Sequence, residues 1–253
     1  MTEKQEKAKR QVKTGDLYEP LLRCVRERRS VRAYKQTPVP EEMIMKILEA
    51  GRWAPSGANS QPWEFIVVNQ RDTLEKISEI FEKDREQRIR EQVNFSGSSK
   101  AYIAKMSALI VVVADPRWKQ TYPSSDITPT LRRMYAENNE LIFAQSVAAA
   151  VQNMFLAAAA LGLGMAWLSG FAERRMGKKL RRLLKVPEPL RLMGGFPVGY
   201  PKRAPGEKFR RPLADLVHTN TYDRSRLKSE GFFRDYCEKE RNRLAYSSGS
   251  PAK

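Results

Sequence analysis

The sequence predicts a layered domain over residues 16–220 in which helices cover a β-sheet, of the α/β or α+β class. Segments with the apolar period of a helix alternate along this stretch with short runs of β-branched, aromatic or wholly apolar residues. Hydrophobic residues make up 41% of the 253-residue chain, which is enough for a sizeable core and excludes wholesale disorder. The length fits one large domain or two small ones, and the continuous alternation favours one.

The first half of the domain is expected to hold three helices and two strands. Residues 16–28 carry leucine and valine on one helical face, and residues 37–55 form a helix that begins after two prolines with two acids in its first turn. Residues 63–69 are a β-branched and aromatic run typical of a strand, and residues 71–92 are a highly charged helix. The apolar run 106–114 predicts a strand that is buried on both faces.

The second half is expected to begin with a long connection. Residues 115–138 contain three prolines and no clear period, so at most a short helix is expected in a segment that resembles a lid or a binding loop. Residues 141–168 have the length of a membrane span, but their internal Gln, Asn and Gly residues favour a buried helix followed by a strand near residues 164–169. No membrane insertion is therefore predicted. A basic helix at 172–184 and an apolar strand at 190–198 complete the domain.

The net charge and the small numbers of Cys and His limit the kinds of ligand and metal site that are expected. The chain carries 46 Lys and Arg against 29 Asp and Glu, a net charge of +17. The basic helix is interpreted as a solvated face, with attraction of an anionic substrate or NAD(P)H as the second interpretation and polynucleotide binding as the third, so specific nucleic-acid binding is not predicted. The two cysteines lack a Cys-x-x-Cys spacing and there is one histidine, which argues against a disulfide framework and a metal site. A reducing, cytoplasmic location is expected.

The two margins of the chain are expected to lie outside the domain. Residues 1–15 are polar and basic without an apolar stretch, so they are interpreted as a flexible tail and not as a secretory signal. Residues 221–253 are charged with scattered aromatic residues and are interpreted as an extension.

Three polar constellations point to a phosphorylated ligand. Residues 28–32 (R-R-S-V-R) place three guanidinium groups and a hydroxyl together, and guanidinium forks suit phosphate and polar ring edges. Residues 54–63 (A-P-S-G-A-N-S-Q-P-W) form a proline-framed loop with small residues for close backbone approach and several polar side chains. Residues 194–201 (G-G-F-P-V-G-Y-P) end a strand, and the basic cluster 208–213 (K-F-R-R-P-L) follows.

Taken together and in this order, these motifs resemble the FMN-dependent nitroreductase family over roughly residues 18–220. The A-L-G-L-G end of the middle helix and the W-L-S-G-F segment also match the order of the family. The resemblance implies an α+β fold with a mixed central β-sheet flanked by helices. It further implies a domain-swapped homodimer with FMN bound at the subunit interface. Residues 221–253 would wrap the partner subunit, with a disordered tail as the alternative.

The resemblance also implies roles for individual residues. Leu168, Ser169 and Gly170 would approach flavin N5, and Ser169 and Gly170 are the predicted catalytic residues because a donor aimed at N5 stabilises charge as electrons move. Ser169 departs from several bacterial nitroreductases, which have a carboxylate there. The predicted cofactor-binding residues are Arg28, Arg29, Ser30, Arg32, Pro55, Ser56, Gly57, Asn59, Gln61, Leu168, Ser169, Gly170, Lys208, Arg210 and Arg211. The predicted acceptor-pocket residues are Ala58, Trp118 and Tyr122.

The activity that the resemblance implies is ping-pong electron transfer. NADH or NADPH would pass a hydride to flavin N5, and a nitroaromatic, a quinone or another flat electron-poor acceptor would then take the electrons. Two alternatives stay open. One is a reductive dehalogenase similar to iodotyrosine deiodinase, a family member that holds its zwitterionic substrate with a Glu, a Tyr and a Lys from a lid. Residues 82–92 contain Glu but no Tyr at the corresponding spacing. The other is a flavin-binding or sensor module without turnover.

Overall fold

The computed structural model describes residues 15–93, 97–120, 127–203 and 210–236. The chain divides into two compact units, residues 1–205 and 206–253. The predicted boundary at residue 220 falls inside the second unit, which therefore also contains part of the sequence expected in the domain. Most of the predicted tail 1–15 lies outside the described residues.

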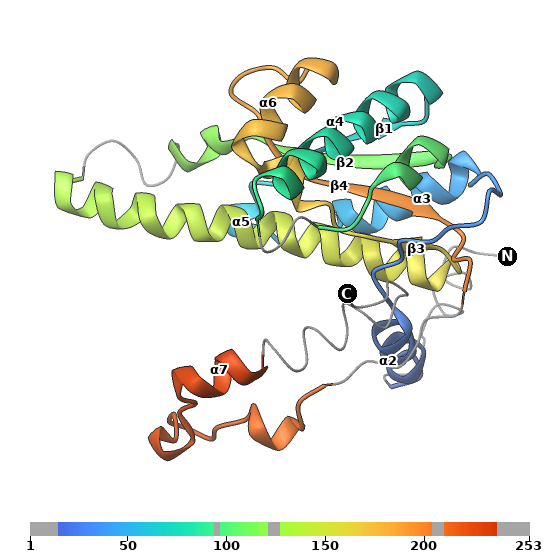
Figure 1. Cartoon of the computed structure of the whole chain (residues 1–253). Coiled ribbons are helices and arrows are strands. Elements are labelled where there is room, and N and C mark those ends of the chain that lie inside the picture. Colours follow the sequence, from blue (N-terminus) through green and yellow to red (C-terminus); the bar gives the residue numbers. More distant parts are fainter. Residues whose placement is uncertain (1–14, 94–96, 121–126, 204–209, 237–253) are drawn as a thin grey trace, which may run out of the picture. The chain divides into compact units, whose positions relative to one another are not determined.

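The first unit contains a four-stranded sheet (Figure 1) with the strand order β1-β2-β4-β3. Its strands are β1 (Trp63–Val68), β2 (Ala108–Ala114), β3 (Gly164–Met165) and β4 (Arg191–Gly199). All three pairings between these strands are antiparallel. The one parallel pairing among the described residues is an isolated bridge between Ser30 and Met165. The α+β class is confirmed, with the parallel contribution to the sheet limited to that bridge.

Helices cover both faces of the sheet, so that the sheet is the middle of three layers (Figure 1). The helices of this unit are α2 (Tyr18–Glu27), α3 (Glu41–Arg52), α4 (Arg71–Arg90), α5 (Pro129–Ala160) and α6 (Arg174–Leu183). Every residue of β2 is buried, as the apolar run predicted. Ile110 and Val112 pack in one core with residues of α3 and α5, whereas Leu109 and Val111 pack in another with residues of α4 and α6. Side-chain alternation along one strand therefore serves two cores.

Helix α5 is longer than the sequence predicted, and the expectation of an irregular connection over residues 115–138 is wrong for its second half. The described connection contains a 3-10 turn, η3 (Pro116–Gln120), and α5 begins at Pro129 with Thr128 accepting a hydrogen bond from the Leu131 N–H at 3.3 Å. The first turns of α5 were not predicted because their apolar residues, such as Met134, are exposed and do not form a periodic face toward the core.

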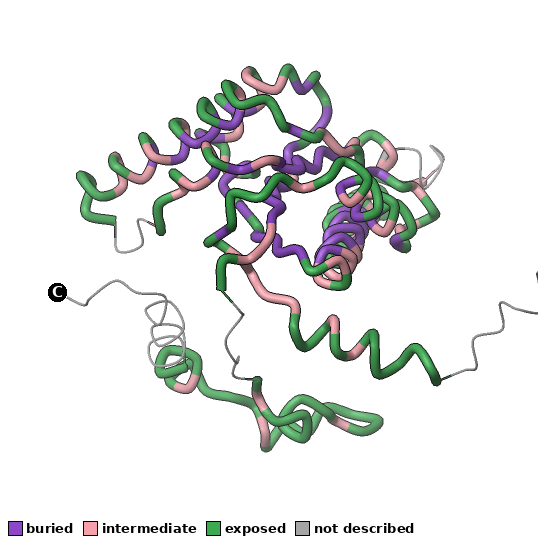
Figure 2. Tube along the Cα trace, turned by 90° about the vertical axis from the view of Figure 1, so that its right-hand side faces the viewer, coloured by how far each residue is buried: buried purple, intermediate pink, exposed green. Residues whose placement is uncertain are grey.

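The apolar part of α5 is a core helix, as predicted. An 18-residue window of α5 has a mean hydropathy of 1.5, which satisfies the length and composition of a membrane span. Its inner residues, however, pack in one core with residues of the sheet and α3, among them Phe143, Val151 and Met154. Figure 2 shows the buried residues gathered in the interior of the first unit. The strand that follows, β3, is shorter than the predicted run 164–169.

The second unit is described over residues 210–236 and holds the 3-10 turns η5 (Leu213–Asp215) and η6 (Arg224–Arg226) and the helix α7 (Glu230–Tyr236). None of these three elements contains a buried residue. The ring of Phe232 lies 5.6 Å from that of Phe233 and 6.1 Å from that of Tyr236, so these aromatic residues pack on one another. The wrapping of a partner subunit by residues 221–253 stays a prediction.

Candidate functional site

The arginine-rich segment 28–32 lies along the β3 edge of the sheet. The Val31 N–H donates to the Met165 carbonyl at 2.9 Å, and Ser30 forms the parallel bridge with Met165. A Cβ on Gly164 would lie 2.4 Å from Cγ2 of Val31, so a larger residue at this position would clash with the Val31 side chain. The Arg28 guanidinium lies over the Phe155 ring of α5 at 5.6 Å from its centroid. The segment is thereby fixed at the sheet edge.

The segment Leu168–Gly170 lies at the same edge. Leu168 exchanges backbone hydrogen bonds with Gly195 of β4 at 2.9 and 3.3 Å, and Ser169 begins the 3-10 turn η4 (Ser169–Ala172). A Cβ on Gly170 would lie 2.6 Å from Cε of Met176 and 2.7 Å from the Phe81 ring. The structure therefore brings together two of the predicted groups, the arginines and the segment expected beside flavin N5.

A buried charge network holds η4 and α6 on α4. Asp84 of α4 is 7% exposed and accepts hydrogen bonds from Nε of Arg88 at 2.7 Å and Nε of Arg175 at 3.1 Å. Arg88 also donates to Glu173, the residue between η4 and α6, at 2.5 Å. Burial acts to raise the pKa of the Asp84 carboxyl, but the hydrogen bonds from Arg175 and Arg88 outweigh it and hold that pKa below its usual value.

The proline-framed loop precedes β1 and is strained. Ala58, Asn59 and Gln61 have φ values of +51°, +51° and +43°, which are uncommon for residues with a Cβ. Two serine hydroxyls support this conformation: that of Ser56 accepts from the Gln61 N–H at 3.0 Å, and that of Ser146 in α5 accepts from the Gly57 N–H at 3.1 Å. The loop therefore has a defined shape in which polar groups of exposed residues such as Asn59 remain accessible.

The loop does not join the other two groups within one chain. It adjoins β1, which is one edge of the sheet, whereas the arginine segment lies along β3 at the other edge. The same separation is found along α5. A Cβ on Gly57 would touch Ile142 at 2.1 Å, and Arg28 lies over Phe155; at 1.5 Å per residue these two positions of α5 are about 20 Å apart.

The remaining predicted residues fall into three places. Trp118 of η3 is half-buried beside the proline-framed loop, with its ring 6.4 Å from that of Phe143. Arg210 and Arg211 belong to the second unit, so their distance from the arginine segment is not defined. Tyr122 and Lys208 lie outside the described residues.

A polar cluster that was not predicted from the sequence lies beside Arg32. Burial, and next to it the charge of Arg32, lowers the pKa of Lys100, and burial raises the pKa of Tyr102 to about 12. The Tyr102 hydroxyl is buried and has no hydrogen-bond partner among the described residues. The Lys100 backbone N–H donates to the Glu82 carboxylate. The sequence signal that could have predicted this cluster is the presence of two polar residues, Lys100 and Tyr102, in the short segment before the buried strand β2.

Comparisons with known proteins decide the family. Residues 25–200, more than half of the chain, match the model of the nitroreductase family. The chain belongs to the nitroreductase family. The matched residues include the arginine segment, the proline-framed loop and the Leu168–Gly170 segment, so the resemblance drawn from these motifs is confirmed.

Individual relatives agree with this membership. The chain is 34% identical over 184 residues, 73% of this chain and 87% of the relative, to an Archaeoglobus fulgidus protein named "Putative NADH dehydrogenase/NAD(P)H nitroreductase". It is 32% identical to the iodotyrosine deiodinase of Drosophila melanogaster, covering 72% of this chain and 62% of that protein. A crystal structure from Desulfovibrio desulfuricans, described as "a putative nitroreductase in complex with fmn", is 30% identical with a TM-score of 0.57 and covers 81% of this chain and 98% of its own.

Proposed function

We propose that this member of the nitroreductase family is an FMN-dependent NAD(P)H oxidoreductase that reduces flat, electron-poor acceptors such as nitroaromatics and quinones. Family membership and the names of the relatives support an oxidoreductase. The FMN complex of a 30% identical structure supports the cofactor. A cytoplasmic location is part of the proposal and is supported by the cysteine content.

The side chains at the β3 edge fit FMN. Arg28, Arg29 and Arg32 would bind its phosphate and polar ring atoms, because guanidinium groups offer several charge-assisted hydrogen bonds. Ser169 and Gly170 would present donors toward N5. When bound, FMN would accept a hydride from NADH or NADPH and deliver electrons to the acceptor. The protein's part is to bind and orient both partners of this exchange.

The observation that carries the proposal is the separation of the motifs at opposite edges of one sheet. A single flavin ring cannot contact residues that lie beside Ile142 and beside Phe155 of the same α5. A second copy of the chain resolves this, because a two-fold axis would bring the proline-framed loop of one protomer to the arginine segment of the other. We therefore propose a homodimer with two composite sites, each built from Arg28–Arg32 and Leu168–Gly170 of one protomer and residues 55–61 of its partner.

A direct test is the colour and turnover of the purified protein. We expect a yellow protein that releases FMN on denaturation and oxidises NADPH or NADH faster when a nitroaromatic is added. Bound flavin without turnover over a panel of nitroaromatics and quinones would favour the flavin-binding or sensor module. Purified protein that stays colourless and does not bind added FMN would refute the proposal.

Mixing two inactive variants tests the composite site. One protomer carries Arg28→Ala and Arg32→Ala, and the other carries Ser56→Ala and Asn59→Ala. After subunit exchange at equal amounts, half of the dimers are mixed and each has one intact site, so about a quarter of the wild-type activity is expected. Activity that stays at the level of the separate variants would contradict a site shared between protomers.

Reductive dehalogenation is a second candidate. The cluster of Lys100 and Glu82 beside Arg32 favours it, since a lysine and a carboxylate can hold the two charges of an amino acid. The identity to an iodotyrosine deiodinase is consistent with this reading. Iodide release from iodotyrosine by the reduced protein, lost in Lys100→Gln while nitroaromatic reduction continues, would establish it. No iodide release from wild type would exclude it.

A further inference from the structure

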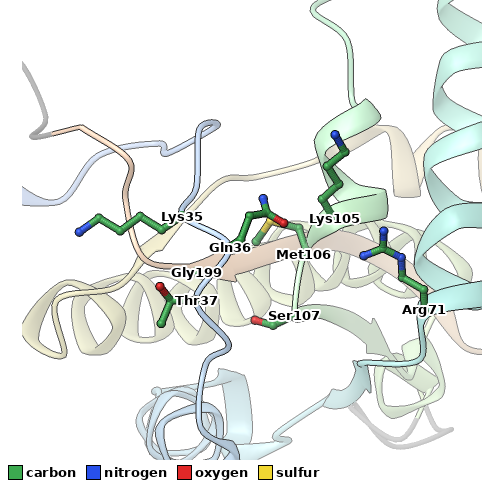
Figure 3. A pocket seen from close by; sticks show the side chains of 8 residues that line it. All are labelled: Lys35, Gln36, Thr37, Arg71, Lys105, Met106, Ser107 and Gly199. Carbon is green, nitrogen blue, oxygen red and sulfur yellow. The ribbon is translucent and has the colours of Figure 1, made fainter.

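A polar cavity opens at the end of the sheet that carries the start of β2 and the end of β4. It has a volume of about 200 Å³ and is lined by Lys35, Gln36, Thr37, Arg71, Lys105, Met106, Ser107 and Gly199. These residues come from four separate parts of the chain, and Figure 3 shows their side chains around one opening. Of the motifs discussed above, only the run 194–201 contributes to the lining, through Gly199, and none of the predicted cofactor-binding residues does. The cavity is therefore a feature of its own.

The lining carries positive charge without a carboxylate. Three of the eight lining residues are cationic, and none is acidic. Arg71 pairs with Glu75 on α4 at 2.8 Å, but both side chains are about half exposed, and such pairs are weak in water. Among the described residues, Lys35 and Lys105 have no carboxylate within ion-pair distance. The cavity therefore has an excess of positive charge that an anion would neutralise.

The backbone around the cavity is well fixed, whereas its cations are adaptable. The Lys35 N–H donates to the Tyr200 carbonyl at 2.8 Å, and the Ser107 hydroxyl accepts from the Val39 N–H at 3.2 Å, which leaves the hydroxyl proton of Ser107 for a ligand. The ammonium groups of Lys35 and Lys105 extend outward in different directions at the rim (Figure 3). Long flexible side chains can turn toward a bound anion, at the cost of rotamer entropy.

We propose that this cavity binds a phosphate group, either as the free ion or as a small phosphate monoester. The cavity volume of about 200 Å³ corresponds to roughly six or seven water molecules. This is room for a phosphate and the first atoms of an ester, and too little for a whole nucleotide. A phosphate also matches the donors, because its oxygens accept hydrogen bonds from ammonium, guanidinium, hydroxyl and amide groups.

Calorimetric titration with inorganic phosphate in low-salt buffer, on the full chain with and without saturating FMN, tests this proposal. We expect saturable binding that FMN does not displace and that weakens by roughly tenfold in Lys35→Gln and again in Lys105→Gln. Lys76→Gln, which removes an exposed charge from α4 away from the cavity, is the matched control and should bind phosphate as wild type does.

The source of the phosphate is decided by a second titration. Adenosine 2′-phosphate that binds more tightly than inorganic phosphate, with the same losses in the two lysine variants, identifies an ester whose base lies outside the cavity. Tighter binding of inorganic phosphate identifies the free ion. The proposal is overturned if neither compound binds, if both lysine variants bind like the control, or if FMN competes. Competition would show that the flavin phosphate uses this cavity, and it leaves the proposed oxidoreductase function untouched.

Discussion

Replacing Asp84 with asparagine tests whether the buried carboxylate holds η4 and α6 on α4. The side chain is 6% exposed, and Arg88 and Arg175 both donate to it. Hydrogen bonds to a charged group contribute roughly 1.5–3 kcal/mol each. The variant should not lose the full contribution of these hydrogen bonds. Arg88 still pairs with Glu173, and the Arg175 side chain is 46% exposed and can bind water. We therefore expect Asp84→Asn to lower the free energy of unfolding by about 2 kcal/mol.

The assay is urea unfolding at neutral pH, supported by thermal unfolding. For a domain of this size the expected loss lowers Tm by roughly 4–8 °C. Glu79→Gln is the control, since Glu79 pairs with Lys83 on the same helix at 3.3 Å with both side chains exposed; it should change stability by less than about 0.5 kcal/mol. An unfolding midpoint for Asp84→Asn equal to that of the control would refute the reasoning.

Wild type and Asp84→Asn should also differ in how their stability depends on pH. The pKa of Asp84 is lowered in the folded state, so its ionised form contributes stability above its unfolded pKa of about 3.9. That contribution is lost as the pH falls through the lower folded pKa. The stability difference between wild type and Asp84→Asn should therefore be complete at neutral pH and shrink below about pH 4. A difference that stays constant into that acid range would contradict the assignment of the carboxylate as the cause.

Three further outcomes are expected. Gly195→Ala should lower stability by roughly 1–3 kcal/mol in urea unfolding, because its Cβ would lie 2.2 Å from the buried Phe171 ring; a stable variant would show that the ring has room to move. Ser169→Ala should change the yield of one-electron-reduced flavin during reductive titration if its hydroxyl reaches N5, and an unchanged yield would discard that contact. Truncation after Asp223 should shift the sedimentation of the proposed dimer toward the monomer, and unchanged sedimentation would show that residues 224–253 do not hold it.

The elements of the fold were predictable wherever burial imposed a period. The apolar run around β2 and the inner face of α4 were read correctly, because Leu74 and Ile77 must face a core for the helix to be stable. The start of α5 was not predicted, because residues 129–138 are almost all exposed and show no apolar period. Its start depends on local chemistry, Pro129 at the first position and the Thr128 cap, which is a weaker signal than a buried face.

The sequence predicted residues for the candidate site but not which of them the fold brings together. Arg28–Arg32 and Leu168–Gly170 are far apart in the sequence, and only the pairing of Ser30 with Met165 and of Leu168 with Gly195 brings them to one edge. No local pattern encodes that pairing, since it depends on which strand lies at the edge of the sheet. The cluster beside Lys100 was missed for the same reason.

The backbone strain of the proline-framed loop supports a binding role for this loop in the proposed dimer. Three residues with a Cβ hold positive φ in residues 58–61, at a cost of order 1–3 kcal/mol each, and a simple turn into β1 would use glycine at these places. The hydroxyls of Ser56 and Ser146 offset part of this cost. Such strain persists where a defined shape is needed for binding. Within the first unit the loop lies at the opposite edge of the sheet from Arg28–Arg32 and Leu168–Gly170. We therefore expect a second protomer to supply these segments to the loop, as the proposed dimer requires.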